Sequence, residues 1–175
     1  MSESQAQHTH EHTQGDPRGD DAELAARLGE SSLFTGLSEA LLLRLARSGS
    51  VIDVKRNDFV FREGDSGDKV YLVLDGAIRI SRTVPGMGEE ALAVLRTGSA
   101  FGEMSLIDGS PRSADAKGHE SSRLYVVNKQ EMERLMFVDR TLAVDLLWKM
   151  VRILTNRLRQ TNDKMTFLSV TGRFE

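Results

Sequence analysis

Phe101–Ala114 reads Phe-Gly-Glu-Met-Ser-Leu-Ile-Asp-Gly-Ser-Pro-Arg-Ser-Ala, and this short segment carries most of the chemistry of the chain. Gly102 permits a positive φ or a close backbone approach directly beside an acid, Glu103. The apolar turn that follows predicts a short helix whose first amides face the loop, where free N–H groups and the helix dipole favour an anion. Arg112 adds a planar fork of donors that suits a phosphate, and Ser113 adds a hydroxyl. The segment therefore predicts an anion site.

The carboxylate of Glu103 narrows the class of anion. An ionised carboxylate only accepts hydrogen bonds, so beside a phosphate it needs a hydroxyl donor on the ligand. A ligand with one phosphodiester and one free sugar hydroxyl satisfies both Glu103 and Arg112, and a 3′,5′-cyclic nucleotide is such a ligand. The alternative is a surface loop with a Glu–Arg pair that contributes little to stability.

The segment resembles the phosphate-binding cassette of the cyclic-nucleotide-binding domain family, whose pattern is roughly F-G-E-x-[AS]-L followed by P-R-[ST]-A. The resemblance implies that Glu103 binds the ribose 2′-hydroxyl and that Arg112 and Ser113 surround the cyclic phosphate with the amides of Gly102 to Met104. The residues of this segment predicted to bind the ligand are Gly102, Glu103, Met104, Ser105, Arg112, Ser113 and Ala114.

Short apolar segments separated by turn residues run from about Val51 to Val127. Six of them are predicted as strands: 51–54, 59–61, 70–74, 76–80, 91–95 and 124–127. Roughly eight short strands at this spacing indicate a double-sheet jelly roll. Helices are predicted before it, at 20–29 and 38–47, and after it, at 129–136 and 141–168. The expected fold is mainly β with flanking helices, a double-stranded β-helix jelly-roll barrel, and Arg62–Asp65, Tyr71–Gly76 and Gly98 match landmarks of the same family.

Four regions are expected along the chain. Residues 1–20 form a polar tail predicted to be disordered, 21–140 the jelly-roll domain with its N-terminal helices, 141–169 a long helix, and 170–175 a truncated, hinge-like end. The tail carries His8, His10 and His12, which could bind a metal weakly when extended. A solvated tail is the favoured interpretation because no packed surroundings would orient the imidazoles, so no metal site is expected.

Composition argues against several functional classes. The formal charge is −3 and cysteine is absent, which excludes disulfides, thiolate metal sites and cysteine nucleophiles. No apolar run is long enough to span a bilayer and no signal peptide is evident, so a soluble cytoplasmic protein is expected. Metal-dependent jelly-roll enzymes need two or three imidazoles inside the barrel, and only His119 lies in the barrel region, so no enzymatic activity is expected.

Inside such a barrel a nucleobase would contact apolar strand faces. By resemblance, Ile80 and Leu92 are the candidates, although both could equally be core residues.

The last helix carries a row of mainly apolar residues, the seam, at alternating spacings of four and three residues. The seam comprises Leu147, Val151, Leu154, Leu158, Thr161, Met165 and Leu168. A second apolar row, Leu146, Met150 and Ile153, would face the barrel. One helix with two apolar faces favours a parallel homodimer, with packing inside the monomer as the alternative.

Polar residues interrupt the seam at Gln160–Asn162. They could set the register of a coiled coil. The segment Arg157–Lys164 also resembles the dimerisation helix of the catabolite-activator type of this family, which implies that Thr161 and Asn162 contact the base, one of them possibly from the partner subunit. The same resemblance implies that Arg157 braces either Glu103 or the phosphate.

The expected function is therefore a stand-alone cyclic-nucleotide receptor, for cAMP or else cGMP, that signals to an effector protein through its C-terminal helix. A hinge-like segment, Val170–Arg173, resembles the lead-in to a helix-turn-helix, but the sequence stops at Glu175. As given, the chain is not expected to bind a DNA operator. Two alternatives stay open, a ligand-free dimeric interaction module and the sensor half of a truncated transcription activator.

Overall fold

The computed structural model describes residues 17–171, with the side chains of residues 20–167. The three histidines of the N-terminal tail and the end of the hinge-like segment lie outside these described residues. The first helix begins at Pro17, earlier than its expected start at Asp20.

The strands form two antiparallel sheets of four strands each. One sheet has the order β1 (Ser50–Val54), β8 (Ser122–Asn128), β3 (Lys69–Asp75) and β6 (Ala100–Phe101). The other has the order β2 (Phe59–Phe61), β7 (Asp115–Gly118), β4 (Ala77–Val84) and β5 (Gly88–Arg96). The predicted jelly roll is confirmed. The six predicted strands are present with slightly different bounds, and β6 and β7 were not predicted as separate strands.

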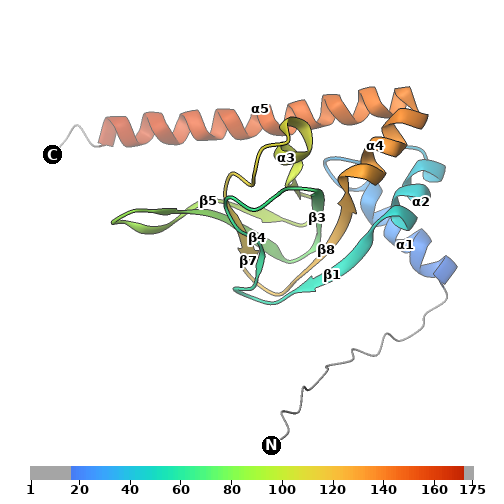
Figure 1. The fold of residues 1–175 in the computed structure, drawn as a ribbon, viewed down its shortest axis with the longest axis horizontal. Helices are drawn as coiled ribbons and strands as arrows, with labels where there is room; N and C mark the ends of the chain where they lie inside the picture. Colours follow the sequence, from blue (N-terminus) through green and yellow to red (C-terminus); the bar gives the residue numbers. More distant parts are fainter. Residues whose placement is uncertain (1–16, 172–175) are drawn as a thin grey trace, which may run out of the picture.

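Five helices of the described chain flank the sheets: α1 (Pro17–Gly29), α2 (Glu39–Ser48), α3 (Glu103–Asp108), α4 (Lys129–Val138) and α5 (Arg140–Thr171). The helices α1, α2 and α4 gather at one end of the sandwich, and α5 runs from there across the molecule, with the short α3 directly beneath it (Figure 1). The expected helices, including the short one in the cassette, are all present.

Strand β3 is buried on both faces because it separates two cores. Val70 and Leu72 point toward the helices, whereas Tyr71 and Val73 point between the sheets, as the two-residue period of a strand requires. The first core contains the inner faces of α1, α2 and α4, and the second holds the barrel together. The barrel and the helices are therefore joined through a shared strand.

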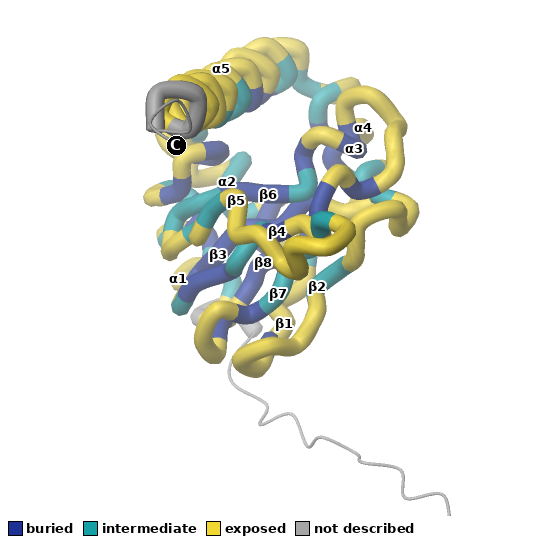
Figure 2. The backbone as a smooth tube through the Cα atoms, turned by 90° about the vertical axis from the view of Figure 1, so that its left-hand side faces the viewer, coloured by how far each residue is buried: buried dark blue, intermediate teal, exposed yellow. Residues whose placement is uncertain are grey.

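The long helix α5 buries one of its two apolar faces. Leu146 and Met150 belong to the core beside the barrel and Ile153 packs against it, as predicted. Most of the seam is exposed, with 46% of the surface of Leu147 and 60% of that of Leu158 accessible, whereas Leu154 is partly buried. Exposure increases toward the C-terminal half of the helix (Figure 2). Within residues 17–171, no helix has the length and apolar character needed to cross a membrane.

Candidate functional site

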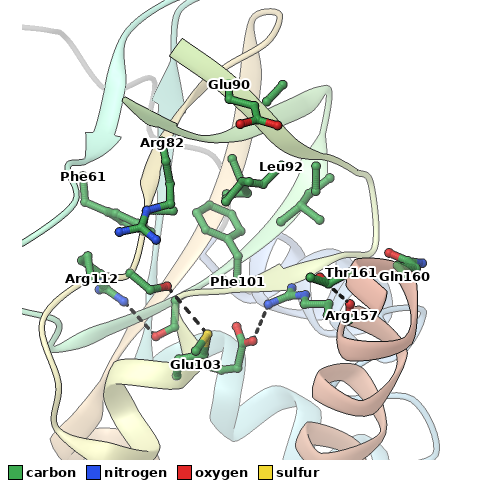
Figure 3. Close-up of a pocket in the computed structure, with 18 of the residues that line it drawn as sticks. Phe61, Arg82, Glu90, Leu92, Phe101, Glu103, Arg112, Arg157, Gln160 and Thr161 are labelled. Carbon is green, nitrogen blue, oxygen red and sulfur yellow. Dashed lines mark hydrogen bonds and ion pairs between the residues drawn. The ribbon is translucent and has the colours of Figure 1, made fainter. Parts of the chain in front are cut away.

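A cavity of about 530 Å³ lies between the barrel, the cassette and α5 (Figure 3), which is within the usual size range of small-molecule sites. Its barrel wall comes from β4 and β5, its floor from β6 and α3, and its remaining wall from α5. Of the predicted ligand residues, those that line it are Ile80, Leu92, Gly102, Glu103, Met104, Ser105, Arg112, Ser113, Ala114, Arg157 and Thr161. Asn162 is exposed and does not line this cavity.

Glu103 is the first residue of α3 and only 1% exposed. One carboxylate oxygen, Oε1, forms an ion pair with Arg157 of α5. The other oxygen, Oε2, is buried and has no hydrogen-bond partner among the described residues. A buried acceptor without a partner is costly, so Oε2 is suited to accept a hydrogen bond from a ligand hydroxyl.

Arg112 is 4% exposed and held by main-chain oxygens. Its two terminal nitrogens each donate a 2.8 Å hydrogen bond, one to the carbonyl of Gly102 and one to that of Lys69. The guanidinium carbon lies 4.3 Å from the centre of the Phe61 ring. Burial lowers the pKa of Arg112 from its ordinary value, although an arginine in a protein stays protonated.

The Nε atom of Arg112 remains available. It is buried and has no hydrogen-bond partner among the described residues, and its side chain lines the cavity. A buried cation with a free donor favours an anion, because the anion offsets the cost of burying the charge. Ser113 lies beside it, with a hydroxyl that contacts only the sulfur of Met104 in the described contacts, at 3.8 Å.

Two glycines allow the backbone to approach Arg112 closely. Gly102 has a φ of 81°, and a Cβ there would lie 2.7 Å from a terminal nitrogen of Arg112. A Cβ on Gly67 would lie 2.3 Å from the Cβ of Ser105 and 3.2 Å from the guanidinium carbon of Arg112. The turn before β3 and the cassette therefore pack together only because both positions lack a side chain.

Of the two contacts left open for Arg157, the structure contains the one with Glu103. The guanidinium pairs with Glu103 and also donates to the carbonyl of Ala100, so it contacts the carboxylate directly. Thr161 follows one turn later and donates from Oγ1 to the Arg157 carbonyl at 3.0 Å. This helix therefore contacts the cassette through the same acid that faces the cavity.

Several cavity residues were not predicted from the sequence. On α5 these are Gln160 and Lys164, which line the cavity together with Arg157 and Thr161. Spacings of three and four residues place all four on one face of a helix, so periodicity could have indicated them once Arg157 was chosen. Arg82 and Glu90, on β4 and β5, also line the cavity, and no motif marks them.

The comparisons with known proteins agree with this architecture. Residues 51–139 match the family model described as the cyclic nucleotide-binding domain. The chain belongs to this family. Among solved structures, it resembles a cyclic nucleotide-binding domain from Methylobacillus flagellatus KT, with 26% identity, a TM-score of 0.73 and coverage of 83% of this chain and 82% of that one.

The names of two curated relatives refer to cAMP. A "CRP-like cAMP-activated global transcriptional regulator" of Mycobacterium tuberculosis is 29% identical over 86% of this chain and 66% of its own length. The "Cyclic AMP receptor protein" of Thermus thermophilus is 36% identical over 63% of this chain and 49% of its own length. The matched part of the chain thus spans about two thirds of the length of the first relative and about half of the length of the second.

The buried groups of the cavity fit a cyclic nucleotide. Glu103 offers an acceptor and Arg112 a donor, both buried and facing the same space, as a sugar hydroxyl next to a phosphate requires. Metal binding has no comparable support, because within residues 20–167 no group of three or more His, Cys, Asp and Glu side chains could hold an ion.

Proposed function

We propose that this chain is a cyclic-nucleotide receptor that binds cAMP in the cavity and responds through α5. The observation that carries the proposal is that Glu103, almost fully buried, offers one oxygen to the cavity and pairs through the other with Arg157. The similarity to the M. tuberculosis and T. thermophilus relatives, whose names refer to cAMP, supports cAMP as the ligand, with cGMP as the alternative.

In this proposal the sugar phosphate binds at the cassette. The ribose 2′-hydroxyl donates to Oε2 of Glu103, and Nε of Arg112 donates to a phosphate oxygen. The hydroxyl of Ser113 turns from the Met104 sulfur to the phosphate. Because these groups are buried and already fixed by their neighbours, little ordering is required when the ligand binds.

The base extends toward β5 and α5. Ile80 and Leu92 provide apolar contact from the barrel, and Thr161 provides a hydroxyl from the helix. A ligand changes the position of a helix only if it binds one position better than another. The ligand and Arg157 contact the two oxygens of one carboxylate, so binding and helix position are coupled through Glu103.

The exposed seam of α5 supports a homodimer as the signalling form. Leu147, Val151 and Leu158 are each about half exposed or more, and their spacings of four and seven residues fit the a and d positions of a coiled coil. Asn162 does not line the cavity of its own chain, so in this proposal it contacts the base of the partner copy. An effector protein would then recognise the repositioned helix.

Calorimetric titration of cAMP and cGMP into wild type and Arg112→Leu tests the proposal. Removing a buried charged contact should weaken cAMP binding about 30-fold or more. Arg123→Leu is the matched control, because Arg123 is exposed on β8 and makes only a long 3.7 Å contact with Asp53. Equal affinity of wild type and Arg112→Leu, with both proteins folded, would overturn the proposal.

Sedimentation of the same samples tests the homodimer. The wild type should sediment as a dimer, and Leu158→Glu should shift it toward the monomer because it places a charge on the seam. A wild type that sediments as a monomer with and without cAMP would contradict the dimeric form while leaving ligand binding intact.

A further inference from the structure

Three cationic side chains of α5 are fastened to main-chain carbonyls of other elements. Lys149 donates to Thr35, in the loop between α1 and α2. Arg157 donates to Ala100 of β6. Lys164 donates to Leu92 of β5 at 2.5 Å. Spacings of seven and eight residues correspond to about two turns, so the three lie along one side of the helix.

The surroundings of Lys164 and Lys149 differ in how much apolar packing holds α5 against the rest of the protein. Lys149 is next to Met150, which is buried in the core, so packing fixes that part of α5. From Leu158 to Phe167 every side chain is exposed. Apolar burial therefore does little to hold the last described turns of the helix on the barrel, and the polar contact of Lys164 carries more weight.

The acceptor of this hydrogen bond is an unusual residue of β5. Ile80 pairs with Ala93 and Ser81 with Ala91, so Leu92 is skipped in the register and forms a β-bulge. A bulge leaves its residue unpaired in the ladder and redirects its side chain. Strand β5 is also the edge of its sheet. The carbonyl of Leu92 is thus accessible, and its side chain lines the cavity.

We propose that Lys164 is a positioning residue that fixes the bulged Leu92 and thereby closes the base end of the cavity. This role rests on the proposed binding of a cyclic nucleotide. Lys164 itself lines the cavity beside Thr161 and Gln160, so the same side chain joins β5 and α5, the two elements that the base would contact. When the hydrogen bond is present, Leu92 and the end of α5 form one wall; when it breaks, the base end opens.

The positioning role predicts different effects on the two parts of the ligand, the base and the sugar phosphate. The sugar and phosphate bind Arg112, which is held by main-chain carbonyls, and Glu103, which is paired with Arg157; neither contact involves Lys164. The base contacts Leu92 and α5. Loss of Lys164 should therefore weaken only the base-dependent share of the affinity and should act mainly on dissociation, because the closed end retains the ligand.

Stopped-flow dissociation of a fluorescent cAMP analogue tests this role with Lys164→Met, which keeps the chain length and removes the donor. Dissociation should become about tenfold faster, the effect of losing one hydrogen bond from a charged group. Competition with the methyl riboside 3′,5′-cyclic phosphate, which has no base, should give the same affinity as in wild type. Lys164→Arg should restore slow dissociation, and Lys149→Met should behave as wild type.

Hydrogen exchange of the ligand-free protein provides a second readout. Amides of β5 and of residues 158–167 should exchange faster in Lys164→Met than in Lys149→Met. Unchanged dissociation, equal weakening of both ligands, or unchanged exchange would overturn the positioning role while cAMP binding by the wild type stands. A wild type that binds neither ligand would overturn the proposed function and this role together.

Discussion

The two ends of the cavity are built in different ways. At the cassette end, Glu103 and Arg112 are 1% and 4% exposed and are held by ion pairing and main-chain carbonyls. At the base end, Leu92 is 40% exposed, and Thr161 and Lys164 are exposed in the C-terminal half of α5. The cassette end is buried within the fold, whereas the base end is formed by two elements, β5 and α5, that are joined by the hydrogen bond from Lys164 to Leu92.

This difference between the two ends is consistent with different roles in ligand binding. A preorganised, buried pair of charges supplies affinity because it requires little rearrangement. In the proposed function the response to ligand would come from the wall made by the edge strand and the exposed helix, because edge strands and exposed helix ends tend to be less stable than the core. In the proposed function the ligand contacts both ends, so its binding at the cassette end would also favour one position of α5 at the base end.

The largest expected effect is at Glu103. Glu103→Gln keeps the shape of the side chain but removes the charge that pairs with Arg157. We expect cAMP affinity to fall by about 10- to 100-fold, as for a hydrogen bond to a charged group. The wild type should also prefer cAMP to 2′-deoxy-cAMP, and Glu103→Gln should lose this preference. Calorimetry with both ligands checks this, and a preference that survives in the variant would assign the 2′-hydroxyl to another group.

A second change tests the rigidity of the cassette end. Gly67→Ala places a Cβ 2.3 Å from the Cβ of Ser105, so the turn and α3 must separate. Overpacking of this kind costs about 1–3 kcal/mol of stability, and the displaced Arg112 should also bind phosphate less well. Thermal unfolding and cAMP titration measure both effects. Ser66→Ala, at the exposed neighbouring position, is the control, and equal behaviour of the two variants would mean that the turn is not packed closely on α3.

The contrast between the cassette end and the base end also explains which features could be predicted from the sequence. Glu103 and Arg112 were predicted because the cassette is a continuous segment in which residue types and spacing must agree. The barrel followed from short apolar segments and turn residues, and only β6 and β7, too short or too polar to stand out, were missed. Local patterns identify local structure.

The base end could be predicted only in part because it depends on tertiary pairing. The bulge at Leu92 arises from the register between β4 and β5, which no residue of β5 encodes alone. Lys164 and Gln160 line the cavity only because α5 passes beside the barrel at this point, which is a tertiary arrangement. For Arg157 the sequence allowed two partners, and packing of α5 beside α3 selected Glu103.

A smaller effect is expected at the apolar wall of the base end. Leu92→Ala removes a side chain that is already 40% exposed, so cAMP affinity should fall only about fivefold. Val94→Ala is a matched control, because Val94 is also 40% exposed but does not line the cavity. Calorimetric titration of the two variants decides the point. If both lose the same affinity, the base does not contact Leu92 and the effect comes from the strand as a whole.

The smallest effect is expected at Thr161. Its hydroxyl donates to the carbonyl of Arg157, and its free lone pairs can accept from the adenine amino group. The contact therefore adds one neutral hydrogen bond at an exposed position, and the net gain is small. Thr161→Ala should lower cAMP affinity about two- to threefold and should leave cyclic inosine monophosphate, which lacks the adenine amino group, unaffected. Competition titration with the two nucleotides measures the ratio. If Thr161→Ala leaves the ratio of the cAMP and cyclic inosine monophosphate affinities unchanged, Thr161 does not recognise the base. Discrimination between bases would then depend on the helix of the partner copy. In that case Asn162→Ala should change the same ratio, and only in the dimer.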